Sequence, residues 1–136
     1  MATTQDQRTL QLTTPLGKDY LLINRLRCTE GLNELFRIEL DMLHEEIPDS
    51  TTLTVIEPEA LLGKPMVVVA IQDPMGGESI ERYFHGICVN FTQGVRHGWF
   101  TGFRATLVPR IWLLTQVSQS RIFQNTSVPD ILRKVF

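Results

Sequence analysis

The amino-acid sequence predicts a mainly β protein: an antiparallel, strongly curled or closed β-barrel of about six to seven strands, with a C-terminal helix cut short. Apolar and polar residues alternate in several segments, most strictly from Phe36 to Met42, as strands with one buried face require. Clusters of Gly, Pro, Asn and Asp separate these segments, which is typical of hairpin turns. Strands do not alternate with full-length helices, which argues against a doubly wound fold.

The composition narrows the class of protein. With 136 residues, 43% apolar and 21% charged, the chain is long enough for one globular domain with a core. The net charge is -2 and the 13 basic residues are scattered, so nucleic acid is not expected as a partner. No apolar stretch approaches the roughly 18 residues of a membrane-spanning helix, so stable membrane insertion is not expected. The polar N-terminus lacks the apolar region of a secretory signal.

The first elements are strands joined by turns. Alternation of Leu10 and Leu12 with polar residues predicts the first strand, and residues 14–19 form a turn cluster. The second strand ends at Gly31, and one of its faces is expected to carry Tyr20, Leu22, Leu26 and Cys28. In the third strand, Phe36, Ile38, Leu40 and Met42 point to the core. Its other face, with Arg37, Glu39 and Asp41, meets water or a polar partner.

The middle of the chain begins with a polar loop at residues 44–54. Pro58–Leu62 reads as one helical turn that Gly63 ends. The apolar run Met66–Ile71 predicts a strand covered on both faces, and residues 73–79 predict a hairpin tip. In the next strand, Ile80–Phe91, the alternation predicts one face with Arg82, Phe84, Gly86 and Cys88, and an opposite face with Tyr83, His85, Ile87, Val89 and Phe91. Gly86 in mid-strand indicates a bulge, a sharp bend or another backbone passing close.

The last third of the sequence is predicted to contain a hairpin loop at residues 93–98 and a strand at Trp99–Val108. Pro109–Leu114 reads as a short helix started by its proline. A second helix is expected to begin at Ser127, whose hydroxyl is placed to accept a backbone N–H of the first turn. Its apolar residues repeat at helical spacing, so Val135 and Phe136 are expected to lie on an underpacked apolar face.

Candidate catalytic and ligand sites are weak throughout the sequence. His44, His85 and His97 are isolated, and His85 reads as a hydrogen-bonded structural imidazole. No nucleophile elbow or phosphate-binding loop occurs. The carboxylate pairs Glu39 with Asp41 and Glu45 with Glu46 fall on a solvated face and in a loop, where acid–base catalysis is not favoured. Cys28 and Cys88 read as two buried thiols in a reducing compartment. We therefore expect no enzyme, no cofactor and no metal.

Four stretches, in this order, resemble the VgrG family, the spike-tip proteins of bacterial type VI secretion, in the N-terminal part of its phage-baseplate-hub-like domain. The first two are Thr14–Leu22, similar to the family's opening "SPLG" turn, and Glu30–Leu40, similar to "EGLSELFxFxL". The third combines residues 61–65 with residues 82–87, and the fourth combines residues 107–114 with residues 121–131. Together they cover nearly the whole chain.

The resemblance implies a structural hub subunit that trimerises in its full-length context and docks on the hexameric Hcp tube. It implies a protein held in the bacterial cytoplasm before firing and then secreted or delivered into a target cell. Effectors or adaptors would attach through regions that this chain lacks. Residues 1–126 would form the first hub-like barrel, and residues 127–136 would start a helix leading to the remainder of the hub domain. The motif positions assigned to folding and barrel closure are Gly31, Phe36, Gly86, Trp112, Phe123 and Ser127.

Two other functions fit the sequence pattern. The chain could belong to the hub of a contractile phage or prophage tail, which gene neighbours would distinguish from a secretion spike. It could also be a small split-barrel flavin- or ligand-binding protein, because its strand-rich, aromatic composition allows one.

Overall fold

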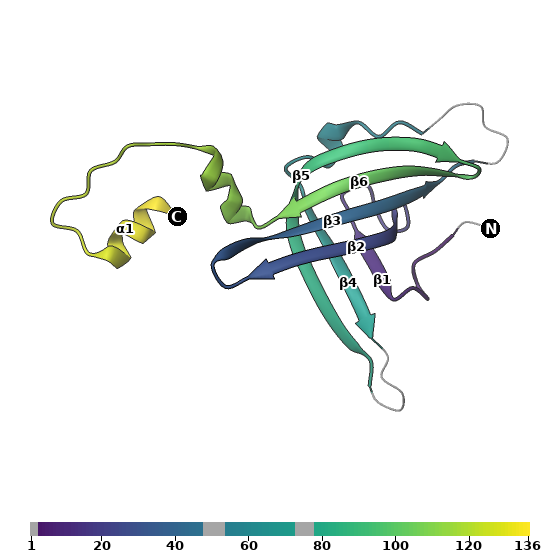
Figure 1. The fold of residues 1–136 in the computed structure, drawn as a ribbon, viewed down its shortest axis with the longest axis horizontal. Coiled ribbons are helices and arrows are strands. Elements are labelled where there is room, and N and C mark those ends of the chain that lie inside the picture. The colour runs from purple at the N-terminus through teal and green to yellow at the C-terminus, as the bar shows by residue number, and fades with distance from the viewer. Residues whose placement is uncertain (1–2, 48–53, 73–77) are drawn as a thin grey trace.

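A computed structural model describes residues 3–47, 54–72 and 78–136 of the chain. Within these ranges it contains six strands, two short 3-10 helices and one α-helix (Figure 1). The strands are β1 Leu10–Thr13, β2 Leu22–Gly31, β3 Glu34–Glu45, β4 Pro65–Gln72, β5 Ile80–His97 and β6 Phe100–Val108. The helices are η1 Pro58–Ala60, η2 Arg110–Gln116 and α1 Val128–Val135. The prediction of a mainly β, strongly curled antiparallel fold is confirmed.

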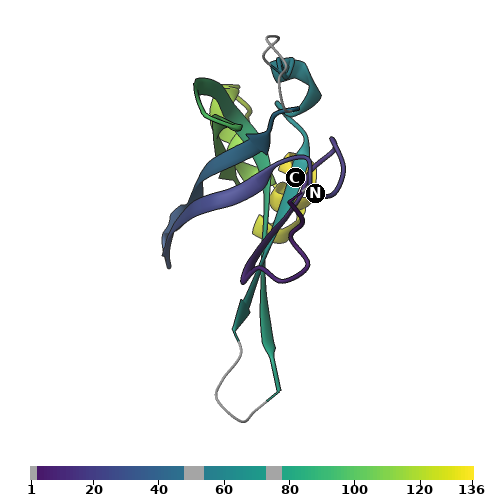
Figure 2. The ribbon, with the colours of Figure 1, turned by 90° about the vertical axis from the view of Figure 1, so that its right-hand side faces the viewer.

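All the strands belong to one sheet with the order β1-β4-β5-β6-β3-β2, and every neighbouring pair is antiparallel. The long strand β5 makes the sheet curl. Its first part pairs with β4 from Ile80 to Ile87, and its second part pairs with β6 from Ile87 to His97. The two arms of the sheet therefore diverge at the middle of β5 (Figures 1 and 2). The end strands β1 and β2 do not pair, so the barrel is half closed.

The core lies on the inner face of the curled sheet. One row across the sheet consists of Cys28, Ile38, Leu107 and Cys88, each paired with the next. In a neighbouring part of the core, the rings of Phe91 and Phe103 stack with centroids 5.5 Å apart. The buried side chains of this cluster are Leu12, Leu21, Ile23, Ile38, Leu40, Met42, Ile56, Leu61, Met66, Val68, Phe84, Cys88, Phe91, Phe103, Ala105 and Leu107.

A bulge in β2 corrects the predicted face of that strand. Ile23 pairs with Met42 while Arg25 pairs with Asp41, so Asn24 is an extra residue. An extra residue reverses the alternation, and Leu22 consequently pairs with Leu43 on the face opposite to Leu26 and Cys28. The prediction of one shared face for Leu22, Leu26 and Cys28 was therefore wrong.

A second bulge changes β5 in the same way. Cys88 pairs with Leu107 and Asn90 pairs with Thr106, which leaves Val89 as the extra residue. Phe91 therefore joins Phe84 and Cys88 in the core, instead of lying on the opposite face as the alternation predicted. The strand also continues past Gln93 to His97, so the predicted loop at 93–98 is reduced to a turn at Gly98 and Trp99.

Other predicted elements are found close to their expected positions. Gly63 follows η1 with φ +73°, the left-handed conformation expected of a glycine that ends a helical turn. In β4, Met66 and Val68 are fully buried while Val67 and Val69 are half-buried, so cover on the second face is partial. Most of the predicted hairpin tip at residues 73–79 lies outside the described residues.

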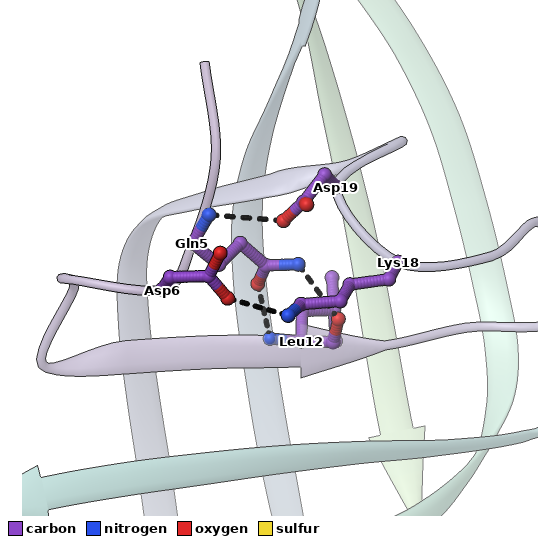
Figure 3. A network of polar contacts seen from close by, with 5 residues as sticks. All are labelled: Gln5, Asp6, Leu12, Lys18 and Asp19. Carbon is purple, nitrogen blue, oxygen red and sulfur yellow. Dashed lines mark hydrogen bonds and ion pairs between the residues drawn. The ribbon is translucent and has the colours of Figure 1, made fainter. Parts of the chain in front are cut away.

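The N-terminal segment covers the outer edge of β1 (Figure 3). Gln5 is 1% exposed, and its side-chain Nε2 donates to the Leu12 carbonyl at 3.1 Å. The Leu12 amide in turn donates to Gln5 Oε1 at 2.5 Å. A side-chain amide thus takes the place of a neighbouring strand. The backbone of Gln5 is held by Asp19 Oδ1 at 2.9 Å, and an ion pair links Lys18 to Asp6 beside it.

Candidate functional site

The outer face of β2, β3, β6 and β5 carries two rows of polar side chains. One row runs Arg25, Asp41, Arg104, Thr92, and the other runs Arg27, Glu39, Thr106, Asn90. They line an open groove of about 360 Å³. The predicted alternation of β3 is confirmed, because its charged residues point away from the core.

The charges on this face are only partly paired. Arg104 Nε donates to Asp41 at 3.1 Å, and Arg37 Nε donates to Glu39 at 3.4 Å. Arg25 and Arg27 form no ion pair or side-chain hydrogen bond within the described residues. Exposed ion pairs contribute about 0–1 kcal/mol each, so this face contributes little to folding. The guanidinium groups of Arg25 and Arg27 are exposed to solvent.

Glu46 is a buried carboxylate, although the sequence placed it in a solvated loop. It is 2% exposed, and its backbone N–H donates to the Trp99 carbonyl at 2.8 Å. Its carboxylate accepts hydrogen bonds from the hydroxyl of Thr101 and, at 2.9 Å, from the hydroxyl of Thr54. Burial alone would raise the pKa of Glu46, but these hydrogen bonds outweigh burial, and the pKa is lowered.

The carboxylates do not form an acid–base pair. The pKa of Glu45 is also lowered, because its carboxylate accepts the Thr3 backbone N–H at 2.6 Å. A catalytic acid at neutral pH needs a raised pKa, and both shifts run the other way. Glu39 and Asp41 lie on the outer face as expected. These residues are better suited to holding loops and facing partners than to acid–base catalysis.

Neither cysteine has the environment of a nucleophile. Both are free thiols, Cys88 buried and Cys28 half-buried. They are separated by three strand spacings across the core row, roughly 14 Å, too far for a disulfide. Burial raises the pKa of Cys88 to about 11. The pKa of Cys28 is also raised, mainly by burial and secondly by the negative charge of Glu30. Reactive thiols have lowered pKa values instead.

The histidines differ from their predicted roles. His85 is exposed and forms no hydrogen bond among the described residues, so its interpretation as a hydrogen-bonded imidazole was wrong. His44 takes that role: its Nδ1 lies 2.7 Å from the Tyr20 carbonyl, and its ring lies against the Tyr20 ring. In the described parts of the chain, no three His, Cys, Asp or Glu residues are grouped to hold a metal ion. None of the helices there has the length and apolar character needed to cross a membrane.

The C-terminal segment leaves the sheet after Val108 and extends away from it (Figure 1). Its side chains enclose a hollow of about 360 Å³, lined by Leu114, Val117, Gln119, Arg121, Phe123 and Val135. None of the residues of α1 is buried. Phe136 is 70% exposed and Val135 is 40% exposed, which confirms the underpacked apolar face expected of these two residues.

Ser127 occupies the predicted N-cap position of α1, but its hydroxyl does not accept a backbone N–H. The hydroxyl donates to Asp130 Oδ2 at 2.6 Å, while the Ser127 carbonyl accepts the Ile131 N–H at 3.0 Å. The expected capping bond was therefore wrong. The negative charge of Asp130 in the first turn still suits the positive end of the helix.

The structure does not bring the six motif residues together. Gly31 and Phe36 belong to the β2–β3 hairpin, where Phe36 packs on the core. Gly86 lies against β6: a Cβ there would come within 2.8 Å of Leu107 Cβ. Two of the predicted reasons for this glycine are observed: the backbone of Val108 passes close, with its oxygen 3.2 Å from such a Cβ, and the pairing of β5 changes from β4 to β6 at the next residue, Ile87. Trp112, Phe123 and Ser127 lie in the C-terminal segment, the first two half-buried.

Sequence reasoning missed two residues with structural roles, Gln5 and Glu46. The pairing of Gln5 depends on how residues 3–8 return to β1, and no local pattern indicates that path. The burial of Glu46 depends on Thr101, which is distant in sequence. Two adjacent glutamates in a polar segment look solvated, so no local pattern indicates the burial of Glu46 either.

Known proteins show clear similarity to this chain. The family model described as the phage tail baseplate hub (GPD) matches residues 29–136. Two Pseudomonas aeruginosa proteins named type VI secretion system spike protein are similar along the sequence. VgrG1a is 43% identical over 95% of this chain and 18% of its own length, and VgrG1c is 40% identical over 100% of this chain and 17% of its own length. The chain thus spans less than a fifth of these relatives.

A solved structure has the same fold. It is the Escherichia coli c3393 protein, described as a component of the type VI secretion system with structural similarity to the T4 bacteriophage tail proteins gp27 and gp5. The two structures superpose with a TM-score of 0.58 and 23% identity, over 85% of this chain and 30% of the other. The curled sheet, the order of motifs and the family match agree, and the chain belongs to the phage tail baseplate hub family, where it groups with the VgrG spike proteins of type VI secretion.

Proposed function

We propose that this chain is a structural, non-enzymatic part of the hub of a type VI secretion spike. The observation that carries the proposal is similarity to VgrG spike proteins over 95–100% of the chain, at 40–43% identity. The physical features support it. The outer strand face offers two arginines that form no ion pair within the described ranges, and the C-terminal segment exposes apolar side chains that would gain free energy from burial.

In this function the chain trimerises within its full-length protein and docks on the Hcp tube. Residues 1–126 form the first hub barrel, and residues 127–136 lead into the rest of the hub domain. The exposed apolar face of α1 supports a boundary of this kind, because it suits contact with further hub structure. Gly31, Phe36, Gly86, Trp112, Phe123 and Ser127 serve folding and barrel closure.

The location of the protein follows from the same function. It resides in the bacterial cytoplasm before firing and leaves with the spike, into the medium or a target cell. Effector or adaptor proteins attach through parts of the full-length protein outside this chain.

The test uses the full-length protein that contains this chain and the Hcp of the same bacterium. Sedimentation should show a trimer, and the trimer should copurify with Hcp. A variant with Leu132→Asp and Phe136→Asp should weaken the trimer, since it places charge on the exposed apolar face. A matched variant with Arg133→Asp, on the same helix but at an already polar position, should not. A full-length monomer that does not bind Hcp would refute the proposal. The 136-residue chain alone should be a monomer or a loose oligomer, and a tight trimer of it would refute that expectation.

A phage or prophage tail hub is the second candidate, because the matching family model is described as a phage baseplate hub. Neighbouring genes decide between the two. Sheath, Hcp and secretion-ATPase genes would support the secretion spike, whereas capsid and terminase genes would support the phage tail. The family match does not support the flavin-binding alternative. Bound flavin absorbs visible light, so a colourless purified protein would exclude this alternative.

A further inference from the structure

Residues 3–8 form a strap across the outer edge of β1 (Figure 3). The Ile71 amide donates to the Thr9 carbonyl at 2.7 Å, so the backbone groups of Thr9 face β4. Leu12 lies three residues further on, so its backbone groups face the other way, and the Gln5 side chain pairs with both of them. Gln5 is the one buried residue of the strap, and all six residues of the strap are of polar or charged types.

Carboxylates from two other segments hold the backbone of the strap. At the end of β3, Glu45 Oε2 accepts the Thr3 N–H at 2.6 Å. In the connection between β1 and β2, Asp19 Oδ1 accepts the Gln5 N–H at 2.9 Å. Asp19 has a φ of +65°, a conformation that is uncommon for residues other than glycine. Two charged acceptors on different segments therefore fix a strap that has no apolar anchor.

The surroundings of Glu45 favour its ionised form. The pKa of Glu45 is lowered, first by hydrogen bonding from Thr3 and then by the positive charges of the chain's amino group and of His44. The carboxylate of the next residue, Glu46, accepts from two threonine hydroxyls instead. A lowered pKa means that Glu45 stabilises the bound strap above its ordinary pKa of about 4.3. That effect is lost as the pH falls through the lowered pKa.

The charges around Asp19 are those of Lys18 and Asp6. The Lys18 ammonium forms an exposed ion pair with Asp6 of the strap and also attracts Asp19. Arg8, the cation of the strap, donates instead to the Ile23 carbonyl at 3.3 Å. Exposed ion pairs contribute little, so the hydrogen bonds to the two carboxylates are the main charge-dependent contacts of the strap.

We propose that acid releases the strap: ionised Glu45 and Asp19 hold residues 3–8 across the edge of β1 at neutral pH, and protonation of both carboxylates frees the strap while the sheet stays folded. A protonated carboxyl group is the weaker acceptor, because hydrogen bonds to charged groups are roughly twice as strong as neutral ones. Release uncovers the Leu12 N–H and C=O, and an uncovered edge is able to pair with another strand. The inference goes beyond the hub function, and every contact that holds the strap lies within residues 3–45.

Hydrogen exchange, read by mass spectrometry at single amides, tests the release on the full-length protein that contains this chain. The exchange rate at the Leu12 amide is measured from about pH 7 to about pH 3.5 and divided by the intrinsic rate at each pH. Two other amides report on the sheet itself. They belong to Gln11, whose backbone faces β4, and to Leu40, in β3 between β2 and β6.

Two double variants separate the strap carboxylates from acidic residues in general. Glu45→Gln with Asp19→Asn keeps an acceptor at both positions but removes the charges. The matched control is Glu39→Gln with Asp41→Asn, which removes the same two charges from residues that bond to arginines on the outer face of the sheet. Circular dichroism checks that both variants keep their β structure.

In the parent, exchange at Leu12 should accelerate roughly tenfold relative to the intrinsic rate between about pH 6 and about pH 3.5, while Gln11 and Leu40 stay protected. The strap variant should exchange faster already at pH 7, with little further change on acidification, and the control variant should behave as the parent. Loss of protection at Leu12 only together with Gln11 and Leu40 would overturn the proposal, because the strap would then open with the sheet. A constant rate at Leu12, or the parent's pH response in the strap variant, would overturn it as well.

Discussion

Substituting Gly86 by Ala tests the explanation of how β5 passes between two strand pairings. An added Cβ would lie 2.8 Å from Leu107 Cβ and 3.2 Å from the Val108 carbonyl oxygen. Carbon atoms in contact are normally about 3.5–4.0 Å apart, so the first distance is too short by most of an ångström. Leu107 is fully buried in the core row, and the Val108 atom is a backbone oxygen. Neither atom can therefore move away through a change of side-chain rotamer.

The size of the effect follows from two opposing terms. Extra methyl groups in a packed core typically cost about 1–3 kcal/mol. Gly86 does not have a positive φ, so alanine also reduces the entropy of the unfolded chain and returns about 0.4–1 kcal/mol. We therefore expect Gly86→Ala to reduce the free energy of unfolding by about 1–2 kcal/mol. For a domain of this size that lowers Tm by roughly 3–8 °C.

Urea unfolding and thermal melting followed by circular dichroism measure this change. The control is Gly102→Ala in β6, where a Cβ would meet only the Val95 carbonyl oxygen, at an ordinary 3.7 Å. That variant should be as stable as the parent or slightly more stable. If Gly86→Ala proved as stable as Gly102→Ala, the close approach of β6 would not be the reason for this glycine.

Three further predictions concern polar groups and thiols. The lowered pKa of Glu46 means that its stabilising effect is present above the unfolded pKa of about 4.3 and is lost as the pH falls through the folded pKa. Glu46→Gln should lower the free energy of unfolding by about 1–3 kcal/mol at pH 7. It should also reduce the loss of stability that the parent shows as the pH falls from about 5 to 3. If urea unfolding gave the variant and the parent the same dependence of stability on pH, this prediction would be contradicted. Because Cys88 is buried with its pKa raised to about 11 and Cys28 is half-buried, a thiol reagent should modify Cys28 first and Cys88 only on unfolding. Mass spectrometry of the labelled native protein measures this order. Labelling of Cys88 before Cys28 would contradict the prediction. Gln5→Ala should cost about 1–3 kcal/mol and speed hydrogen exchange at the Leu12 amide, and unchanged protection there would refute the edge-covering role.

The class of fold and most strands could be predicted from the sequence because alternation reports a half-buried strand directly. In β3 the pattern is uninterrupted, and the strand has its expected faces from Phe36 to Met42. Turn chemistry was informative for the same reason, since Gly63 adopts the positive φ that few other residues tolerate.

The prediction of which face of the sheet a side chain lies on was wrong where a strand contains a bulge. Leu22 and Phe91 were assigned by unbroken alternation, but Asn24 and Val89 each add a residue and exchange the two faces beyond it. Neither bulge has a glycine, so the sequence shows no local sign of it. The polar contacts of Gln5 and Glu46 could not be predicted for a different reason. Each joins segments that only the fold brings together.

The candidate surfaces of this chain differ in the physical force that would hold a partner. The C-terminal segment exposes Ile122, Leu132 and Phe136, and burying apolar area gives contacts that salt hardly weakens. The outer strand face offers two exposed arginines, Arg25 and Arg27, whose attraction to carboxylates is screened within about 8 Å at physiological ionic strength. In a hub assembled as proposed, the first surface therefore suits a permanent contact and the second suits an exchangeable one. Raising the salt concentration should release a partner from the outer strand face while leaving contacts of the C-terminal segment in place.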